Sequence, residues 1–354
     1  LKRKKDVSAI KKYYVSANTA EGFINLLPSN VKDLKYVIIL KHPSYKLKTA
    51  VIKKVIERHK DNELEILLSP KQKAYLDGVI IRDKKAAVII ENITTPNLPG
   101  AIEIDLNLFT SVQIPKDLSN EKQKIQEYMN LAYDHFQNGL KIHDDLEAIY
   151  INEMDFQKAD ELAETFIEKM LDDMPERPKK GNIYYRLFGT NTADGVVNEV
   201  PHITQSVSKA YFIKGRAGTG KSTFMKKIAE ACRQHGFDIE QYYCSFDPNS
   251  IDMVLVRELD FCIFDSTDPH EFFPERNDDE IIDIYEIAVS PGTDEKYAKE
   301  IKETHDHYKS YMKNGIKKIK KAGEHLETIE QQFHFKDEEI KNITDFITEK
   351  AIVQ

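Results

Sequence analysis

Residues 215–222 of the chain read GRAGTGKS and fit the pattern G-x-x-x-x-G-K-[ST] at every position. Glycines let the backbone N–H groups of such a loop approach a bound phosphate, and the N-terminus of the following helix adds positive potential. We expect Lys221 to reach the β- and γ-phosphates of a nucleotide, and the Ser222 hydroxyl to ligate Mg²⁺. The predicted nucleotide-binding residues are Gly215, Arg216, Ala217, Gly218, Thr219, Gly220, Lys221, Ser222 and Thr223.

Three aspartates follow apolar segments in the same half of the chain. Residues 261–265 read FCIFD, so Asp265 ends a predicted buried strand and is the candidate for a second Mg²⁺ ligand. Asp247 and Asp268 follow strand ends, the edge at which open α/β sheets bind ligands. The predicted catalytic residues are Lys221, which stabilises charge, and Asp247 and Asp268, either of which is a candidate to position the attacking water. Both aspartates also precede a proline and fit a plain turn.

Two arginines and a histidine lie near these motifs. Arg216, inside the loop, and Arg276 are candidates to stabilise charge on a transferred phosphoryl group, or are solvated arginines. His270 fits a histidine of a surface loop.

The chain contains a tandem duplication. NTAEG at residues 18–22 recurs as NTADG at residues 191–195, an offset of 173 positions. The same offset aligns further side chains of the two halves: Lys41 with Lys214, Lys48 with Lys221, and Thr49 with Ser222. Two prolines and a glycine in residues 174–181 mark the junction. Because about 100–200 residues make one domain, the 354 residues predict two domains, at residues 1–174 and 175–354.

The first half has lost the glycines of the loop. Residues 42–49 read HPSYKLKT, so His42, Tyr45 and Leu47 replace Gly215, Gly218 and Gly220. A Cβ at these positions obstructs a close approach by phosphate, and the proline removes an N–H donor. The strand expected at residues 87–90 runs into a glutamate instead of an aspartate. We therefore predict a degenerate domain in the first half.

The hydrophobic pattern predicts an α/β fold. Short runs of β-branched and aromatic residues predict buried strands at 37–40, 65–68 and 86–90, and at 211–213, 241–244 and 261–264. Amphipathic helices are expected after Lys48 and Lys221, and long charged helices within 119–172 and 294–350. The prediction is two tandem P-loop NTPase-like domains, each a parallel sheet flanked by helices, with long helices at the end of each repeat.

The chain resembles, over nearly its whole length, a little-characterised family of tandem P-loop ATPases, sometimes labelled nucleotide kinases, from spore-forming Gram-positive bacteria. The resemblance rests on residues 214–223, 244–252 and 279–285, and above all on FDSTDPHE at 264–271. It implies ATP binding without naming a physiological substrate. The first half departs from the glycine-rich sequence typical of such proteins.

Three functions are compatible with these motifs. The leading one is an ATPase that uses ATP and Mg²⁺, with one site in the second half; ATP is favoured over GTP because no N-K-x-D stretch is present. A small-molecule or nucleotide kinase would need an acceptor pocket as well. A nucleotide-regulated nucleic-acid binder would use a basic helix face, although nearby glutamates also fit a solvated helix. That face would consist of Lys313, Lys317, Lys318, Lys320 and Lys321. A homodimer is compatible with the sequence.

The composition excludes several classes of protein. The chain is 41% hydrophobic and 31% charged, which excludes a largely disordered chain. No apolar run reaches the ~18 residues of a membrane span, so we predict no membrane partner. The net charge of −8 gives no general attraction to nucleic acid. Cys232, Cys244 and Cys262 form no CxxC pair and predict free thiols in a cytoplasmic protein.

Overall fold

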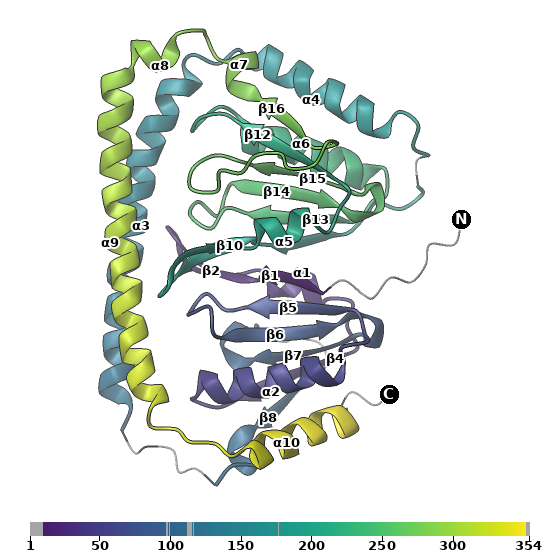
Figure 1. Ribbon diagram of the computed structural model, residues 1–354, viewed down its shortest axis with the longest axis vertical. Coiled ribbons are helices and arrows are strands. Elements are labelled where there is room, and N and C mark those ends of the chain that lie inside the picture. Colours follow the sequence, from purple (N-terminus) through teal and green to yellow (C-terminus); the bar gives the residue numbers. More distant parts are fainter. Residues whose placement is uncertain are drawn as a thin grey trace.

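The computed structural model describes residues 10–96, 98, 100–111, 115, 117–175 and 177–351. They form two six-stranded, mostly parallel sheets flanked by helices, with a pair of long helices along one side of both sheets (Figure 1). The predicted α/β class is confirmed at this level.

The two sheets repeat the same strand order. The first runs β1 (Lys11–Tyr14), β5 (Leu64–Leu68), β6 (Leu76–Ile81), β7 (Ala86–Ile90), β4 (Tyr36–Lys41), β8 (Ala101–Asp105). The second runs β9 (Ile183–Arg186), β13 (Ile239–Tyr243), β14 (Ile251–Val256), β15 (Phe261–Asp265), β12 (Lys209–Lys214), β16 (Glu280–Asp283). Each strand thus has a counterpart in the other half, as the sequence duplication predicts.

One strand of each sheet departs from the expected parallel arrangement. β6 pairs antiparallel with both β5 and β7, and β14 does the same with β13 and β15. Only a three-residue 3₁₀ turn joins each of them to the next strand: η1 (Arg82–Lys84) and η4 (Arg257–Leu259). So short a connection cannot make the crossover that parallel neighbours need. The hydrophobic pattern of the sequence did not predict these two buried strands.

Smaller elements complete each half. In the first half they are β2 (Ser16–Thr19), β3 (Gly22–Asn25), α1 (Leu27–Val31), α2 (Tyr45–Arg58), η2 (Glu91–Ile93) and η3 (Leu106–Leu108). In the second they are β10 (Gly189–Thr192), β11 (Gly195–Asn198), α5 (Val200–Thr204), α6 (Lys221–Gln234), α7 (Ile284–Ala288) and α8 (Thr293–Lys296). α2 and α6 confirm the helices expected after Lys48 and Lys221.

The predicted long helical regions are each divided into shorter helices. The first forms α3 (Ser119–Ile151) and α4 (Phe156–Leu171). The second forms α9 (Ala298–Glu330), α10 (Asp337–Phe346) and η5 (Ile347–Ala351). α3 and α9, which are far apart in the sequence, lie side by side as an antiparallel pair of helices, hereafter the α3–α9 hairpin (Figure 1). Within the described part of the chain, no helix combines the length and apolarity that a membrane span requires.

The two repeats exchange their last helices. α4, from the first repeat, packs on α6 of the second, where the Phe166 ring lies 4.8 Å from that of Tyr211 and 5.8 Å from that of Phe224. α10, from the second repeat, packs on α2 of the first and buries Ile343 there. Figure 1 shows α4 and α10 at opposite ends of the molecule. The boundary predicted at residues 174/175 divides the sequence into its two repeats. In space, however, α4 and α10 each pack against the repeat on the other side of this boundary.

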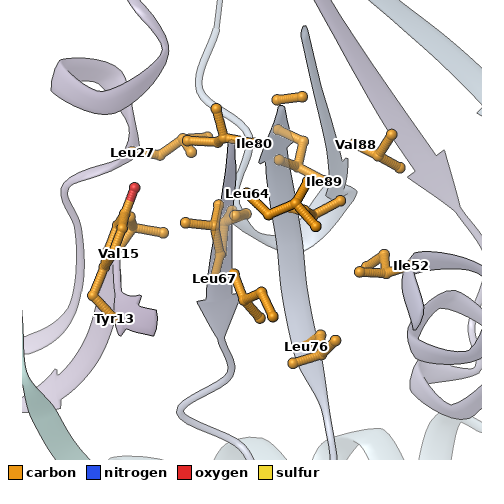
Figure 2. Packing of buried hydrophobic residues seen from close by; sticks show 14 of the residues in the cluster. Tyr13, Val15, Leu27, Ile52, Leu64, Leu67, Leu76, Ile80, Val88 and Ile89 are labelled. Atoms are coloured by element: carbon orange, nitrogen blue, oxygen red, sulfur yellow. The ribbon is translucent and has the colours of Figure 1, made fainter. Parts of the chain in front are cut away.

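The core of the first half continues into the second. Figure 2 shows Ile52 of α2 with Leu76 and Val88 of the sheet among its side chains. The same contiguous cluster includes Phe212 and Phe264 of the second sheet. Burial of these apolar side chains, at about 25 cal/mol per Å², holds the two halves together as one unit.

A buried charge cluster lies where the two halves meet. The backbones of Tyr14 and Leu187, 173 residues apart, exchange two hydrogen bonds of 2.9 Å. Beside them the Arg186 guanidinium, 2% exposed, lies 3.1 Å from Glu65 Oε2 and 2.8 Å from Glu240 Oε2. Glu65 belongs to the first sheet and Glu240 to the second, so a single arginine bridges them.

Candidate functional site

The glycine-rich loop at residues 215–222 connects β12 to α6, as the motif predicts. Gly218 and Gly220 have φ angles of +74° and +77°, a region that L side chains rarely adopt. A Cβ on Gly218 would also lie 2.5 Å from the backbone oxygen of Glu147. Helix α3 therefore lies directly against the loop, and Gly218 is required both for the turn and for this contact.

Lys221 and Asp265 are brought together. The Lys221 ammonium lies 3.6 Å from Asp265 Oδ2 and donates a 2.6 Å hydrogen bond to the Arg216 carbonyl oxygen. Asp265 Oδ1 accepts hydrogen bonds from the backbone and hydroxyl of Thr267. The acidic strand end predicted from the sequence thus adjoins the lysine of the loop.

Asp252, at the start of β14, is a site residue that sequence reasoning missed. Burial raises its pKa to about 7, and repulsion from Asp265 acts in the same direction. The Lys221 ammonium opposes this shift. A signal existed in the sequence, because Asp77 and Arg82 of the first repeat match Asp252 and Arg257 at an offset of 175 positions, but β14 itself was not predicted.

The remaining loop residues lie close to their expected places. The Ser222 hydroxyl accepts a 3.0 Å hydrogen bond from the Ile251 backbone N–H, next to Asp252. Thr219 Oγ1 bridges the backbone of Arg216, donating to its oxygen and accepting from its nitrogen. Ala217 packs against a cluster that contains Leu146 and Tyr150 of α3. Thr223 is exposed on α6.

The two predicted catalytic aspartates differ in position. Asp247 Oδ1 accepts a hydrogen bond from the Asn249 N–H and so stabilises a turn. The negative charge of Asp247 also raises the pKa of Glu147. Asp268 is 60% exposed and forms an ion pair of 2.8 Å with Lys309 of α9. Its carboxylate therefore faces the α3–α9 hairpin.

His270 is buried, contrary to the expected surface histidine. It packs edge-on against Phe188 with ring centroids 5.0 Å apart, and burial lowers its pKa. The turn after β15 folds back over the core, which accounts for the difference.

The arginines have other partners. Arg216 pairs with Asp294 at 2.8 Å and stacks over the Tyr285 ring. Arg276 pairs with Asp279, which accepts from the Ala210 N–H at the amino end of β12, the end opposite the loop. The sequence-based role of Arg276 beside a transferred phosphate is therefore wrong.

Helix α3 adds three polar side chains to the site. The ligand atoms of His143, Asp144 and Glu147 lie within 4.8 Å of one another. Burial raises the pKa of Glu147, as do the charges of Asp144 and Asp247, while the Gly218 backbone N–H and the Lys221 ammonium lower it. Burial and the Lys221 charge lower the pKa of His143. These residues belong to the first repeat, so motif spacing gave no indication that they would meet the loop.

The donor set fits Mg²⁺. Ser222, Asp252 and Asp265 offer hydroxyl and carboxylate oxygens, the ligands that Mg²⁺ prefers. The repulsion between Asp252 and Asp265 is the kind that a bound cation relieves.

The degenerate loop of the first half is closed by residues of the chain itself. Lys48, 1% exposed, bonds Glu91 Oε1 at 2.9 Å and Asn92 Oδ1 at 3.0 Å. Ile90 stands at the β7 position that corresponds to Asp265 in β15, and Glu91 follows it. The lysine conserved between the repeats is thus neutralised internally.

Glu330, at the end of α9, occupies the N-terminus of α2. Glu330 is 1% exposed. Its carboxylate accepts hydrogen bonds from the Ser44 hydroxyl at 2.6 Å, the Tyr45 N–H at 2.5 Å and the Lys46 N–H at 3.2 Å. Tyr45 and Lys46 align with Gly218 and Thr219. A carboxylate therefore holds the backbone donors that a phosphate would use.

Comparison of the chain with protein-family models, with curated proteins and with solved structures found no match in any of the three.

Proposed function

We propose that the chain binds ATP with Mg²⁺ at residues 215–222 and hydrolyses it. The observation that carries the proposal is the 3.6 Å approach of Lys221 to Asp265, beside a loop with two glycines at positive φ and a helix N-terminus. This combination provides backbone donors, a cation and a carboxylate at the carboxyl ends of neighbouring strands.

In this proposal each residue of the loop has a distinct task. The backbone N–H groups of residues 217–222 bind the phosphates, and Lys221 exchanges the Arg216 carbonyl for a phosphate oxygen. Ser222 and Asp265, with Asp252 beside them, hold Mg²⁺. Bound Mg²⁺ neutralises charge on the phosphates.

Asp247 is the proposed residue for positioning water. The charge of Asp247 raises the pKa of Glu147 and of Asp252, and the Lys221 ammonium lowers the pKa of the same two carboxyls. Asp247 therefore belongs to the same group of charges as the loop lysine. Asp268 is less suited because its carboxylate is paired with Lys309.

The partners of two arginines favour hydrolysis over transfer to an acceptor. A kinase needs arginines at the transferred phosphate, and Arg216 and Arg276 are bound to Asp294 and Asp279 instead. Nucleic-acid binding by the basic face of α9 remains a separate prediction; Lys313, Lys317 and Lys320 are exposed there.

The test is release of inorganic phosphate from MgATP by the full chain and by Lys221→Ala, Asp265→Asn and Lys48→Ala variants. We expect Lys221→Ala and Asp265→Asn each to lower kcat by about a hundred-fold or more, because each removes charge stabilisation of the transition state. Lys48→Ala is the matched control and should retain the wild-type rate. Wild-type turnover by Lys221→Ala would overturn the proposal.

A further inference from the structure

We propose that the first half holds a binding site for a small organic anion with an apolar group, in the cavity between the degenerate loop and the α3–α9 hairpin. The proposal is independent of nucleotide binding in the second half.

The cavity has one polar and one apolar wall. Its volume is about 250 Å³, somewhat below the ~300–1,000 Å³ of sites for drug-sized molecules. The hairpin supplies the apolar wall, with Ile125 and Met129 from α3 and Ile319 and Leu326 from α9. Lys71, after β5, lies on the polar wall. A ligand with a short hydrocarbon or aryl group matches this lining.

The polar wall carries unpaired positive charge. Lys48 is already bonded to Glu91 and Asn92. Lys71 lines the same cavity, and among the described residues its ammonium has no hydrogen-bond or ion-pair partner. Burial lowers the pKa of Lys71, as expected for an ammonium removed from bulk water, and the charge of Asp77 opposes this shift.

A second cation lies on the lining. Lys122 of α3 is exposed, and its ammonium likewise has no partner within the described part of the chain. With Lys48 and Glu91 cancelling, Lys71 and Lys122 leave the lining positive, which favours an anionic head group.

A nucleotide is a poor fit for this site. The backbone N–H groups of Tyr45 and Lys46, which would cradle phosphates, are held by Glu330. We therefore expect the anion to pair with Lys71 or Lys122, neither of which belongs to the degenerate loop at residues 42–49. A carboxylate attached to an apolar chain satisfies both walls.

The experiment is titration calorimetry of the full chain with octanoate, and with octan-1-ol and inorganic phosphate as probes of each part alone. We expect octanoate to bind with Kd of about 1 mM or tighter, and each partial probe at least ten-fold more weakly. Lys71→Gln should weaken octanoate binding about ten-fold or more. Lys313→Gln, an exposed lysine of α9 outside the cavity lining, is the matched control and should bind like the wild type.

A second variant keeps the test decisive if Lys71→Gln does not fold. Ala322→Leu fills part of the cavity from α9 and should also weaken octanoate binding. Lys221→Ala should bind octanoate normally, which separates this site from the nucleotide site. No octanoate binding at about 1 mM, or equal affinity in the wild type, Lys71→Gln and Ala322→Leu, would overturn the proposal.

Discussion

The Glu330 carboxylate accepts a 2.6 Å hydrogen bond from the Ser44 hydroxyl, 286 residues earlier in the chain. It accepts two further bonds from backbone N–H groups at the start of α2. In the second half, Glu147 of α3 lies at the corresponding position beside Gly218. The long helices α3 and α9 thus each place a glutamate from one repeat at the loop of the other repeat.

Replacing Glu330 with glutamine should destabilise the fold without creating a nucleotide site. The variant loses charge-assisted hydrogen bonds to a helix N-terminus in a buried position, at a cost of about 2–3 kcal/mol in the free energy of unfolding. Urea denaturation followed by circular dichroism measures this. Glu327→Gln, which breaks only an exposed pair with Lys46, is the control and should cost less than about 1 kcal/mol. Wild-type stability, or a second ATP site in Glu330→Gln, would contradict this account of the degenerate loop.

Glu147→Gln should strengthen ATP binding. The Glu147 carboxylate lies beside the Gly218 N–H, and its charge opposes an incoming phosphate. Removing about 1 kcal/mol of this repulsion should lower the Kd for MgATP roughly five-fold in calorimetry. Glu127→Gln, on the same helix but about 30 Å away, makes the same change in net charge and should leave the Kd unaltered. Weaker binding in Glu147→Gln would show that the carboxylate assists the nucleotide.

Arg186→Met should be among the more destabilising single substitutions at the interface of the halves. It removes the guanidinium that bridges Glu65 and Glu240, at a cost of about 3 kcal/mol in the free energy of unfolding, although Glu65 keeps Arg82 and Glu240 keeps Arg257 as partners. Arg177→Met removes an exposed pair with Glu258 and should cost less than about 1 kcal/mol. Equal effects of the two substitutions in urea denaturation would argue against a structural role for the bridge.

Asp77 should make the stability of the first half depend on pH. Burial raises its pKa to about 6, against hydrogen bonds from Ser69 and Ser16 that lower it. The fold therefore favours the protonated carboxyl, so its stabilising contribution is complete below about pH 4 and is lost as the pH rises through 6. Between pH 4 and 7 the wild type should lose up to about 3 kcal/mol relative to Asp77→Asn. Parallel stability curves for the two proteins would refute this.

The duplicated fold was predictable because both repeats kept the residues that meet at their junction. Asn18 and Asn191, matched in the sequence, donate from Nδ2 to each other's backbone oxygen at 2.9 and 3.3 Å. The strands β6 and β14 were missed because an aspartate, Asp77 or Asp252, interrupts each short apolar run. Their antiparallel direction follows from the short connections to β7 and β15.

The candidate site was predictable only where one local motif defined it. The pairing of Lys221 with Asp265 follows because β12, which leads into the loop, and β15, which ends at Asp265, are adjacent parallel strands. Asp252 could be placed at the site only if β14 were known. Glu147 could be placed there only if the packing of α3 against the loop of the other repeat were known. The contact between Glu147 and Gly218 joins residues 71 positions apart and depends on the packing of helices, which hydrophobic periodicity does not predict.

The most direct test of the central claim is calorimetric titration of the full chain with MgATP, comparing the wild type with Lys221→Ala and Lys48→Ala. We predict one site per chain in the wild type and in Lys48→Ala, and none in Lys221→Ala. Two sites in the wild type, or binding abolished by Lys48→Ala instead of Lys221→Ala, would contradict the assignment of the nucleotide site to the second half.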